Sequence, residues 1–427
     1  MNRSPRQSTL GGVKTSALRL ASVCLFLIAA ASFLPAQAKH GFVRTQGEQL
    51  VDGSGQPLLL RGINLGNWFE VEGYMFHFDD GPQSPREIED LTKELLGPAK
   101  AEEFWRQWRA SYITQADLDR IHAMGFNSIR VPLHWKFFSS DDAEGFKLVD
   151  RLLEWARKDG LYVILDLHCA PGGQTGSNID DSWGYPWLYS SQEAQDETVA
   201  VWKRIAARYK NNPTVLGYDL LNEPLPNWPK LAPLKRELVP VYMKISAAIR
   251  QVDHNHILIL GGANWDTDIG VFSGTFDPNM MFTLHKYWTE KTDASVIQPY
   301  LDFRREHHVP IWLGESGENK DAWVEAFRKT LEQNNVGWAF WTYKRMDATP
   351  CVVTFDRPAH WDAIVAFAKV PTGTGNAEKR LAARPPQSDI DAAFADLLTK
   401  IQFANEHVNP SYVEALGMNA KPVAGSQ

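Results

Sequence analysis

The residues best suited to chemistry are two glutamates, each near the end of a short apolar run. Glu223 is the centre of an Asn-Glu-Pro motif, and Glu315 begins a Glu-Ser-Gly motif. The proline after Glu223 cannot continue a strand ladder and makes the chain turn there. Hydrolysis of a glycosidic bond needs two facing carboxyl groups, because one protonates the leaving oxygen while the other attacks or stabilises the anomeric carbon. Glu223 is therefore the candidate acid/base and Glu315 the candidate nucleophile.

Further polar or aromatic side chains end apolar runs: Arg130, His168, Asn222, His285, Tyr287 and Trp341. A fixed guanidinium such as Arg130 would keep a neighbouring nucleophile ionised. The Asn222 amide would hold a sugar 2-hydroxyl, and Tyr287 would donate to the nucleophile. The two histidines would hold sugar hydroxyls or tune Glu223, and the Trp341 indole would form a flat floor for one sugar ring.

Metal binding is an alternative use of His168, His285, Glu223 and Glu315. The sequence has no His-x-x-Glu-His or His-x₃-His spacing among them, so close ligand pairs on one element are missing. A Ser-His-Asp hydrolase is disfavoured as well, because no Gly-x-Ser-x-Gly elbow follows a strand. We predict a reaction that uses no metal and no other cofactor.

The elements that must position these residues form a repeated pattern of apolar runs and helical stretches. The runs cover residues 58–65, 126–133, 162–168, 215–223, 256–262, 280–287, 309–317 and 337–344. Apolar runs between helices indicate a parallel sheet covered by helices, and eight units indicate an α/β fold closed into a (β/α)₈ TIM barrel. An open doubly wound sheet is the alternative, but the first turn lacks the Gly-rich phosphate loop usual there.

Segments outside this repeat extend the barrel. Residues 42–60 resemble a short N-terminal β-hairpin with its turn at 52–55. Long insertions at 70–111 and 169–192 follow the first and third strands, so both would lie over the active face.

The predicted catalytic domain covers residues 39–370. Residues 371–427 form a C-terminal helical extension: a linker and one amphipathic helix over 389–403, packed on the barrel exterior or partly disordered.

The N-terminus has the features of a secretory signal peptide over residues 1–38. Four basic residues precede or begin an apolar stretch, and Ala36-Gln37-Ala38 is a small-x-small cleavage site. The apolar stretch is short for a membrane span, although an uncleaved anchor is the alternative. We expect a secreted chain, periplasmic or extracellular, without stable membrane insertion after cleavage.

Net charge limits the classes of binding partner, and the cysteine content limits the possible disulfides. Removing residues 1–38 would leave 40 basic against 51 acidic residues, a net charge of −11, which does not suit nucleic acid or anionic lipid. Only Cys169 and Cys351 would remain, either as one bridge or as two free thiols. The 16 tryptophans would serve a large aromatic core or stack on sugars. We expect a monomer with a neutral oligo- or polysaccharide as its partner.

Taken together, these residues resemble glycoside hydrolase family 5. The family's set is matched in order by Arg130, His168, Asn222, Glu223, His285, Tyr287, Glu315 and Trp341. The resemblance covers about residues 42–369. It implies a TIM barrel with the acid/base at the end of strand four and the nucleophile at the end of strand seven.

Within that family, two sequence motifs are most similar to those of the exo-β-1,3-glucanase branch. Arg-Gly-Ile-Asn-Leu-Gly-Asn-Trp at 61–68 is followed by Glu72, and Leu-Asp-Leu-His-Cys-Ala-Pro-Gly-Gly-Gln occupies 165–174. The resemblance implies that Glu72 binds the terminal glucose in the −1 subsite. The chain departs from the branch at 314–318, at 342–344 and in its C-terminal extension, which leaves linkage and exo or endo mode open. Glu318 is interpreted as a loop residue.

The function expected is that of a retaining β-glycosidase acting on β-glucans, with β-1,3 or mixed linkage and exo action favoured. Endo-β-1,4-glucanase action and cleavage of a glycolipid-type glucoside are alternatives within the class. A non-catalytic carbohydrate-binding barrel is the alternative from another class, although such proteins usually lose a catalytic glutamate.

Overall fold

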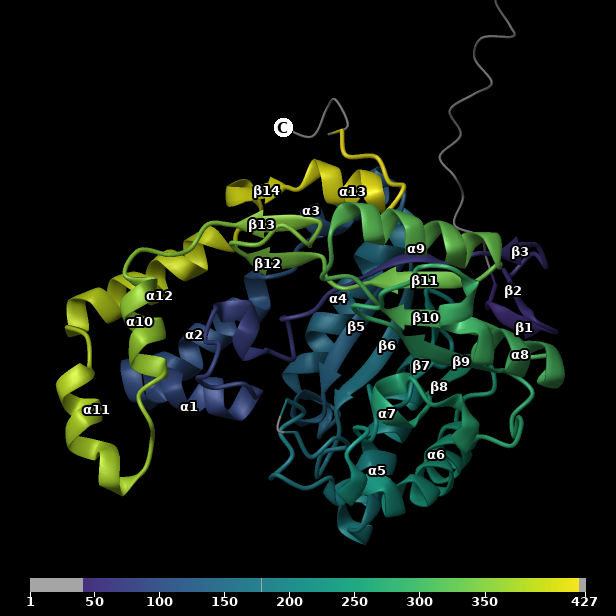
Figure 1. Cartoon of the computed structure of the whole chain (residues 1–427), viewed down its shortest axis with the longest axis horizontal. Coiled ribbons are helices and arrows are strands. Elements are labelled where there is room, and N and C mark those ends of the chain that lie inside the picture. Colours follow the sequence, from purple (N-terminus) through teal and green to yellow (C-terminus); the bar gives the residue numbers. More distant parts are fainter. Residues whose placement is uncertain (1–40, 178, 422–427) are drawn as a thin grey trace, which may run out of the picture. The chain divides into compact units, whose positions relative to one another are not determined.

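Eight parallel strands close into a barrel with helices around it (Figure 1). The barrel strands are β4 (Arg61–Asn64), β5 (Ser128–His134), β6 (Tyr162–Cys169), β7 (Val215–Asp219), β8 (Ile257–Gly261), β9 (Met280–His285), β10 (Ile311–Glu315) and β11 (Gly337–Phe340). They pair in chain order, and β11 returns to β4. The computed structural model, which describes residues 41–177 and 179–421, thus confirms the TIM barrel and excludes the open sheet.

The helices around the barrel begin and end at residues that favour those positions. They are α3 (Gln115–Met124), α4 (Glu144–Asp159), α5 (Gln192–Tyr209), α6 (Lys235–Arg250), α7 (Ala263–Asp266), α8 (Gln298–His307) and α9 (Asp321–Gln333). Thr114 and Asp117 form a capping box that satisfies free N–H groups at the start of α3. Gly160 ends α4 in the left-handed conformation, which costs glycine little.

Most barrel strands end earlier than their apolar runs suggest, β7 and β11 by four residues each. β7 ends at Asp219 and β11 at Phe340, so Glu223 and Trp341 lie in the loops just beyond. Glu223 has a φ of 46°, in the left-handed region, and Leu225 has a φ of 51°. The chain turns sharply there, which is why the strand ladder stops before the glutamate.

The N-terminal sheet contains one more strand than expected. It consists of β1 (Arg44–Gln46), β2 (Gln49–Val51) and β3 (Pro57–Leu58), all antiparallel. The predicted turn at 52–55 joins β2 to β3, and a second turn at Gly47 joins β1 to β2. Val43 and Leu50 share a buried cluster with Ile164 and Trp312, so this sheet covers the N-terminal end of the barrel.

The predicted C-terminal helix is present as α12 (Gln387–Lys400). Its buried face consists of Ile390, Ala393, Phe394 and Leu397, as the spacing predicted. Its main neighbours are α10 (Trp361–Ala368) and the two helices of the first insertion, α1 (Pro85–Leu96) and α2 (Pro98–Ser111). The helix therefore packs on the insertion rather than directly on the barrel wall (Figure 1).

A third sheet, not expected from the sequence, joins the extension to the barrel loops. β13 (Val353–Phe355) pairs in parallel with β12 (Lys344–Met346) and antiparallel with β14 (Glu406–Val408). The short helix α11 (Ala377–Ala383) lies in the stretch predicted as a linker, and α13 (Pro410–Ala415) follows β14 and packs on α9.

The predicted signal peptide lies outside the described residues. Within residues 41–177 and 179–421, no helix has both the length and the apolar character needed to cross a bilayer.

Candidate active site

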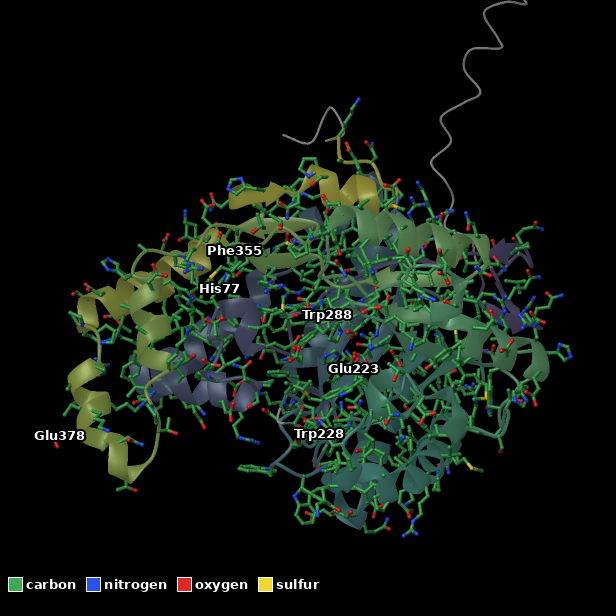
Figure 2. All side chains as sticks on the ribbon, viewed as in Figure 1. His77, Glu223, Trp228, Trp288, Phe355 and Glu378 are labelled. Carbon is green, nitrogen blue, oxygen red and sulfur yellow. The ribbon has the colours of Figure 1, made fainter. Side chains whose placement is uncertain are left out.

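The two candidate glutamates face each other at the C-terminal end of the barrel. Glu315 is the last residue of β10, and Glu223 follows β7 by four residues. A carboxylate oxygen of Glu223 and one of Glu315 lie within 4.8 Å of each other. Figure 2 marks Glu223 among the barrel loops, with Trp288 near it in this view. Both glutamates line one cavity of about 580 Å³.

Glu315 is held by a cation and a hydroxyl group. Its Oε1 lies 2.5 Å from Arg130 Nη1, and Tyr287 donates its hydroxyl to Oε2 over 3.0 Å. Burial raises the pKa of Glu315, while the guanidinium of Arg130 lowers it. These contacts hold the carboxylate in one orientation and favour its ionised form.

Arg130 is fixed by groups that sequence reasoning missed. Its Nε donates to Asp219 over 2.8 Å, and Asp166 lies 3.1 Å from Nη2. Asn64, which was also missed, accepts from Nη1, and Asn222, one of the predicted site residues, accepts from Nη2. Burial raises the pKa of Asp166 and of Asp219 to about 7, and the charge of Arg130 opposes this. An acidic residue within an otherwise apolar strand was the available sequence signal.

Glu223 has a different environment. Its Oε1 lies 3.1 Å from His285 Nδ1, and its backbone N–H donates to Asp266 over 3.0 Å. No lysine or arginine of the described residues forms an ion pair with it. Burial, and then the charge of Glu315, raise the pKa of Glu223 well above its usual value. The pair is therefore asymmetric, and Glu223 is the carboxyl that keeps its proton longer.

Asp266 is a further acidic residue that the sequence did not reveal. It lies in α7 with Asn264 and Trp265, and all three have positive φ. Its Oδ2 accepts from Glu223 N and lies 3.5 Å from His285 Nε2. Asp266 therefore holds the backbone at Glu223, and its carboxylate lies near the His285 ring without a hydrogen bond to it.

His168 is likewise oriented by neighbouring polar side chains. Its Nδ1 lies 2.7 Å from Asp166, and its Nε2 lies 3.2 Å from the amide nitrogen of Asn222. Its ring stacks on Trp341, with centroids 5.6 Å apart. Burial lowers the pKa of His168 to about 3, so the ring is neutral and Nε2 accepts.

One wall of the cavity comes from the first insertion. Glu72 and Tyr74 line it beside Trp341, whose indole N–H donates to the Tyr74 hydroxyl over 2.7 Å. Glu318 also lines the cavity and pairs with Arg345 at 2.8 Å. Burial raises the pKa of Glu72 to about 8, and the charge of Glu318 adds to the effect.

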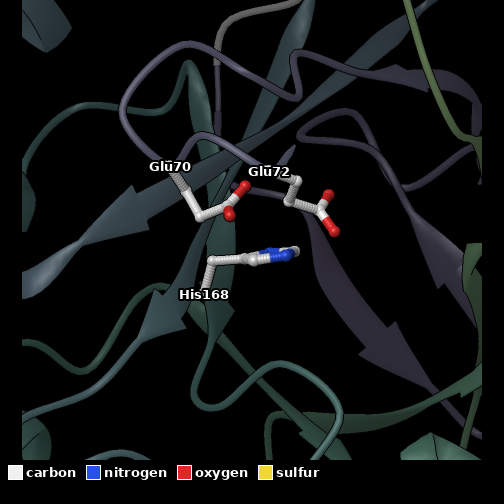
Figure 3. A group of neighbouring side chains, drawn as sticks. All are labelled: Glu70, Glu72 and His168. Atoms are coloured by element: carbon white, nitrogen blue, oxygen red, sulfur yellow. The ribbon is translucent and has the colours of Figure 1, made fainter. Parts of the chain in front are cut away.

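Glu70 lies behind Glu72 and was not expected at the site. Figure 3 shows the carboxyl groups of Glu70 and Glu72 above the His168 ring. Glu70 is fully buried, and neither of its carboxyl oxygens has a hydrogen-bond partner among the described residues. Burial, and then the charge of Glu72, raise the pKa of Glu70 well above its usual value.

Two sets of donor atoms are close enough to hold a cation: Glu70, Glu72 and His168, and Glu223, His285 and Glu315. In the first set, the Asn222 amide already faces His168 Nε2. The second set contains the facing carboxyl pair itself. Hydrogen bonds hold the second set together, whereas the Glu70 oxygens of the first set have no such partner among the described residues. The prediction of a metal-free reaction stays a prediction.

The nine predicted residues thus come together at one end of the barrel, although their roles remain predictions. Cys169 and Cys351 are both buried and free, so the bridge left open by the sequence does not form. Six tryptophans are almost fully buried and belong to the core: Trp68, Trp108, Trp202, Trp312, Trp338 and Trp361. Trp265 and the exposed Trp288 line the cavity and were not singled out from the sequence.

Similarity to known proteins agrees with this geometry. Residues 92–347 match the model of the cellulase family, glycosyl hydrolase family 5. A β-xylosidase from Phanerodontia chrysosporium is 29% identical over 294 residues, which cover 67% of this chain and 59% of that protein. A glucan 1,3-β-glucosidase from Candida oleophila is 34% identical over 187 residues, 39% of this chain and 42% of that one.

A solved structure, described as an endogalactoceramidase, shares the fold. It covers 88% of this chain and 84% of its own length, with a TM-score of 0.57 and 17% identity. The family match spans more than half of the chain and contains seven of the eight barrel strands, β5 to β11. The chain belongs to glycosyl hydrolase family 5.

Proposed function

We propose that this chain is a retaining β-glycosidase that hydrolyses β-glucans, with β-1,3 or mixed linkage and exo action favoured. The observation that carries the proposal is the facing pair of Glu223 and Glu315, with oxygens within 4.8 Å. A separation of about 5 Å suits direct attack by one carboxylate, whereas inversion needs about 6.5–9.5 Å to admit a water.

The surroundings of the pair assign the two roles. Glu315 lies against Arg130 and Tyr287 and attacks the anomeric carbon as a carboxylate. Glu223 keeps its proton, gives it to the leaving oxygen, and then takes a proton from the water that releases the sugar. His285 is neutral because burial lowers its pKa well below the usual value, so it does not compete as a proton donor.

Exo action is supported by the wall that Glu72, Tyr74 and Glu318 form beside Trp341. Such a wall would stop a glucan chain one sugar beyond the cleaved bond. The similarity to a glucan 1,3-β-glucosidase is consistent with this choice.

Endo-β-1,4-glucanase action is the second candidate, since the matching family model carries the name cellulase. Trp288 is 67% exposed at the cavity, and the ring of Trp228 lies 6.3 Å from that of Trp265. Exposed indoles can stack on further sugars or on an apolar leaving group, so a glycolipid-type glucoside stays a third candidate.

The test is hydrolysis of linkage-defined glucans, with products sized over time and their anomeric form followed by NMR. We expect glucose with β configuration as the first product from a β-1,3 glucan. Early release of mixed oligosaccharides would indicate endo action, and α-configured product would contradict retention.

Glu315→Ala tests the nucleophile. We expect turnover to fall by at least about 10⁴-fold, because no covalent intermediate can form. Azide should restore part of the activity on an aryl β-glycoside and yield the α-glycosyl azide. Glu325→Ala, which removes an exposed carboxylate on α9, is the control and should keep the retaining reaction. Near-normal turnover in Glu315→Ala would contradict the assignment.

We also propose that the chain is secreted. The support is the signal-like sequence at residues 1–38. Mass spectrometry of the exported protein should find Lys39 as the first residue. A membrane-bound chain that retains residues 1–38 would contradict the proposal.

A further inference from the structure

The end of the C-terminal extension lies against the segments that follow β10 and β11. β14 pairs with β13, and α13 packs on α9. Both elements lie outside the residues 92–347 that match the family. Figure 1 shows α13 and β14 in yellow beside the green β13 and α9. A segment that the family match does not include therefore borders the site.

Tyr412 of α13 makes the direct connection. Its ring is fully buried, and its hydroxyl group donates to the backbone oxygen of Trp341 over 3.1 Å. Trp341 is the cavity residue that stacks on His168. The hydroxyl thus holds the main chain of a residue whose side chain lies in the site.

The same hydroxyl reaches the segment that carries the nucleophile. Gly317 forms an isolated parallel bridge with Trp341, and Trp341 N donates to Ser316 O over 2.7 Å. A Cβ atom on Gly317 would lie 2.9 Å from the Tyr412 hydroxyl. Tyr412 is therefore packed against the point where the chains after Glu315 and Phe340 meet.

Charged contacts anchor this part of the extension. Glu406 of β14 forms ion pairs with the buried Lys344 and with Arg120. Lys344 also lies 3.2 Å from Asp117 of α3. Because Lys344 follows Trp341 by three residues, these contacts fix β14 to the strand that leaves the site. Tyr412 is consequently attached to a rigid support.

We propose that Tyr412 is a positioning residue for glycosyl transfer. It holds Trp341 and the segment after Glu315 in register, so that sugar ring and nucleophile meet at attack distance. The proposal rests on the proposed glycosidase function, because it concerns the same site. A displacement of a reacting group by about 1 Å can cost about 10²-fold in rate, so a single hydrogen bond can be visible in kinetics.

Tyr412→Phe tests the proposal, because it removes the hydroxyl and keeps the ring. A 2-deoxy-2-fluoro-β-glucoside with a good leaving group traps the nucleophile covalently and separates binding from attack. We expect the trapping rate constant to fall about tenfold, with a smaller change in the inhibitor's dissociation constant. The matched control is Tyr209→Phe, which removes the buried hydroxyl that donates to Asp150 over 3.0 Å on the outer helices.

Hydrogen exchange supplies a second readout that needs no activity. In Tyr412→Phe, peptides over 314–318 and 339–343 should exchange at least about threefold faster, and in Tyr209→Phe they should not. Tyr412→Leu, which also loses the ring, should enlarge both effects.

The outcomes separate the two proposals. If Tyr412→Phe melts at a lower temperature but keeps the wild-type trapping rate and exchange, Tyr412 is a structural residue only and the inference is wrong. If no glycoside traps the wild-type protein, the proposed function fails. Unchanged exchange in those peptides would then overturn the positioning role as well.

Discussion

At the scale of single residues, the site distinguishes two glutamates by what surrounds them. Glu315 has Arg130 at 2.5 Å, whereas Glu223 has a neutral histidine and no paired cation among the described residues. We therefore propose that the same side-chain type serves as nucleophile in one place and as acid in the other. Environment, rather than residue identity, sets such roles.

The pH profile of Glu223→Gln should report this asymmetry. The raised pKa of Glu223 keeps the acid protonated as pH rises, and activity falls on the alkaline side once pH passes that pKa. The glutamine variant has no such proton, so its alkaline limb should disappear. For a poor leaving group, kcat/KM should fall by about 10²–10⁴-fold, and less for an activated aryl glycoside. An alkaline limb that persists in the variant would refute this role.

Glu70→Gln should show how a buried acid affects folding. In the unfolded chain Glu70 ionises at about pH 4.3, but the folded protein raises its pKa well above that. Above the unfolded value the folded state must hold a proton that the unfolded state has released, so wild-type stability falls as pH rises through this window.

The glutamine substitution removes that penalty. The melting temperature of Glu70→Gln relative to the wild type should therefore be higher at pH 8.0 than at pH 4.0. Glu103→Gln is the control, since the Arg106 hydrogen bond lowers the pKa of this exposed group and the sign reverses. Equal differences at both pH values would show that Glu70 is not held neutral.

At the scale of elements, close packing of the loop after β4 against the end of β11 sets the floor of the site. A Cβ atom at Gly66 would lie 2.5 Å from Trp341 Cη2 and 2.9 Å from Thr342 Oγ1. Only glycine lets the first loop approach the indole this closely. The tryptophan is thus positioned by a neighbouring strand as well as by its own.

Gly66→Ala should displace the Trp341 indole. Overpacking of this kind costs about 1–3 kcal/mol, and we expect KM to rise while kcat falls. Steady-state kinetics and urea unfolding measure the two effects. Gly375→Ala, where a Cβ would meet no atom within 4 Å, is the control. Wild-type kinetics in Gly66→Ala would mean that the indole has room to move without loss.

At the scale of the whole molecule, the extension and the barrel form one structure around a buried lysine. Lys344 is fully buried and pairs with Asp117 of α3 and Glu406 of β14. Its Nζ also donates to the backbone oxygens of Tyr112 and Ile401. Residues more than 200 positions apart in the sequence thus meet at one charge.

Lys344→Met should destabilise the protein by about 3–5 kcal/mol, because it leaves the buried Asp117 without its cation and leaves Glu406 with Arg120 alone. Urea unfolding followed by circular dichroism measures the loss. Lys329→Met, which breaks the exposed pair with Glu325, should change stability little. A similar small change in Lys344→Met would show that the buried pair is not needed.

The sequence by itself determined the barrel and the composition of its active end. Apolar periodicity reports which face of each element is buried, and parallel strands bring their C-terminal residues together, so Glu223, Glu315 and their neighbours could be found without coordinates. The helix α12 was found in the same way, because its buried positions recur at helical spacing.

Only the tertiary structure decided the rest. The oxygen separation of the glutamates, the acids Asp219 and Asp266 that hold Arg130 and the Glu223 loop, and the joining of β14 to β13 depend on contacts between distant segments. Periodicity carries no information on such contacts. A buried carboxyl such as Glu70 also looks like any surface glutamate until burial removes its water. Charge pairing and distance are properties of the folded chain.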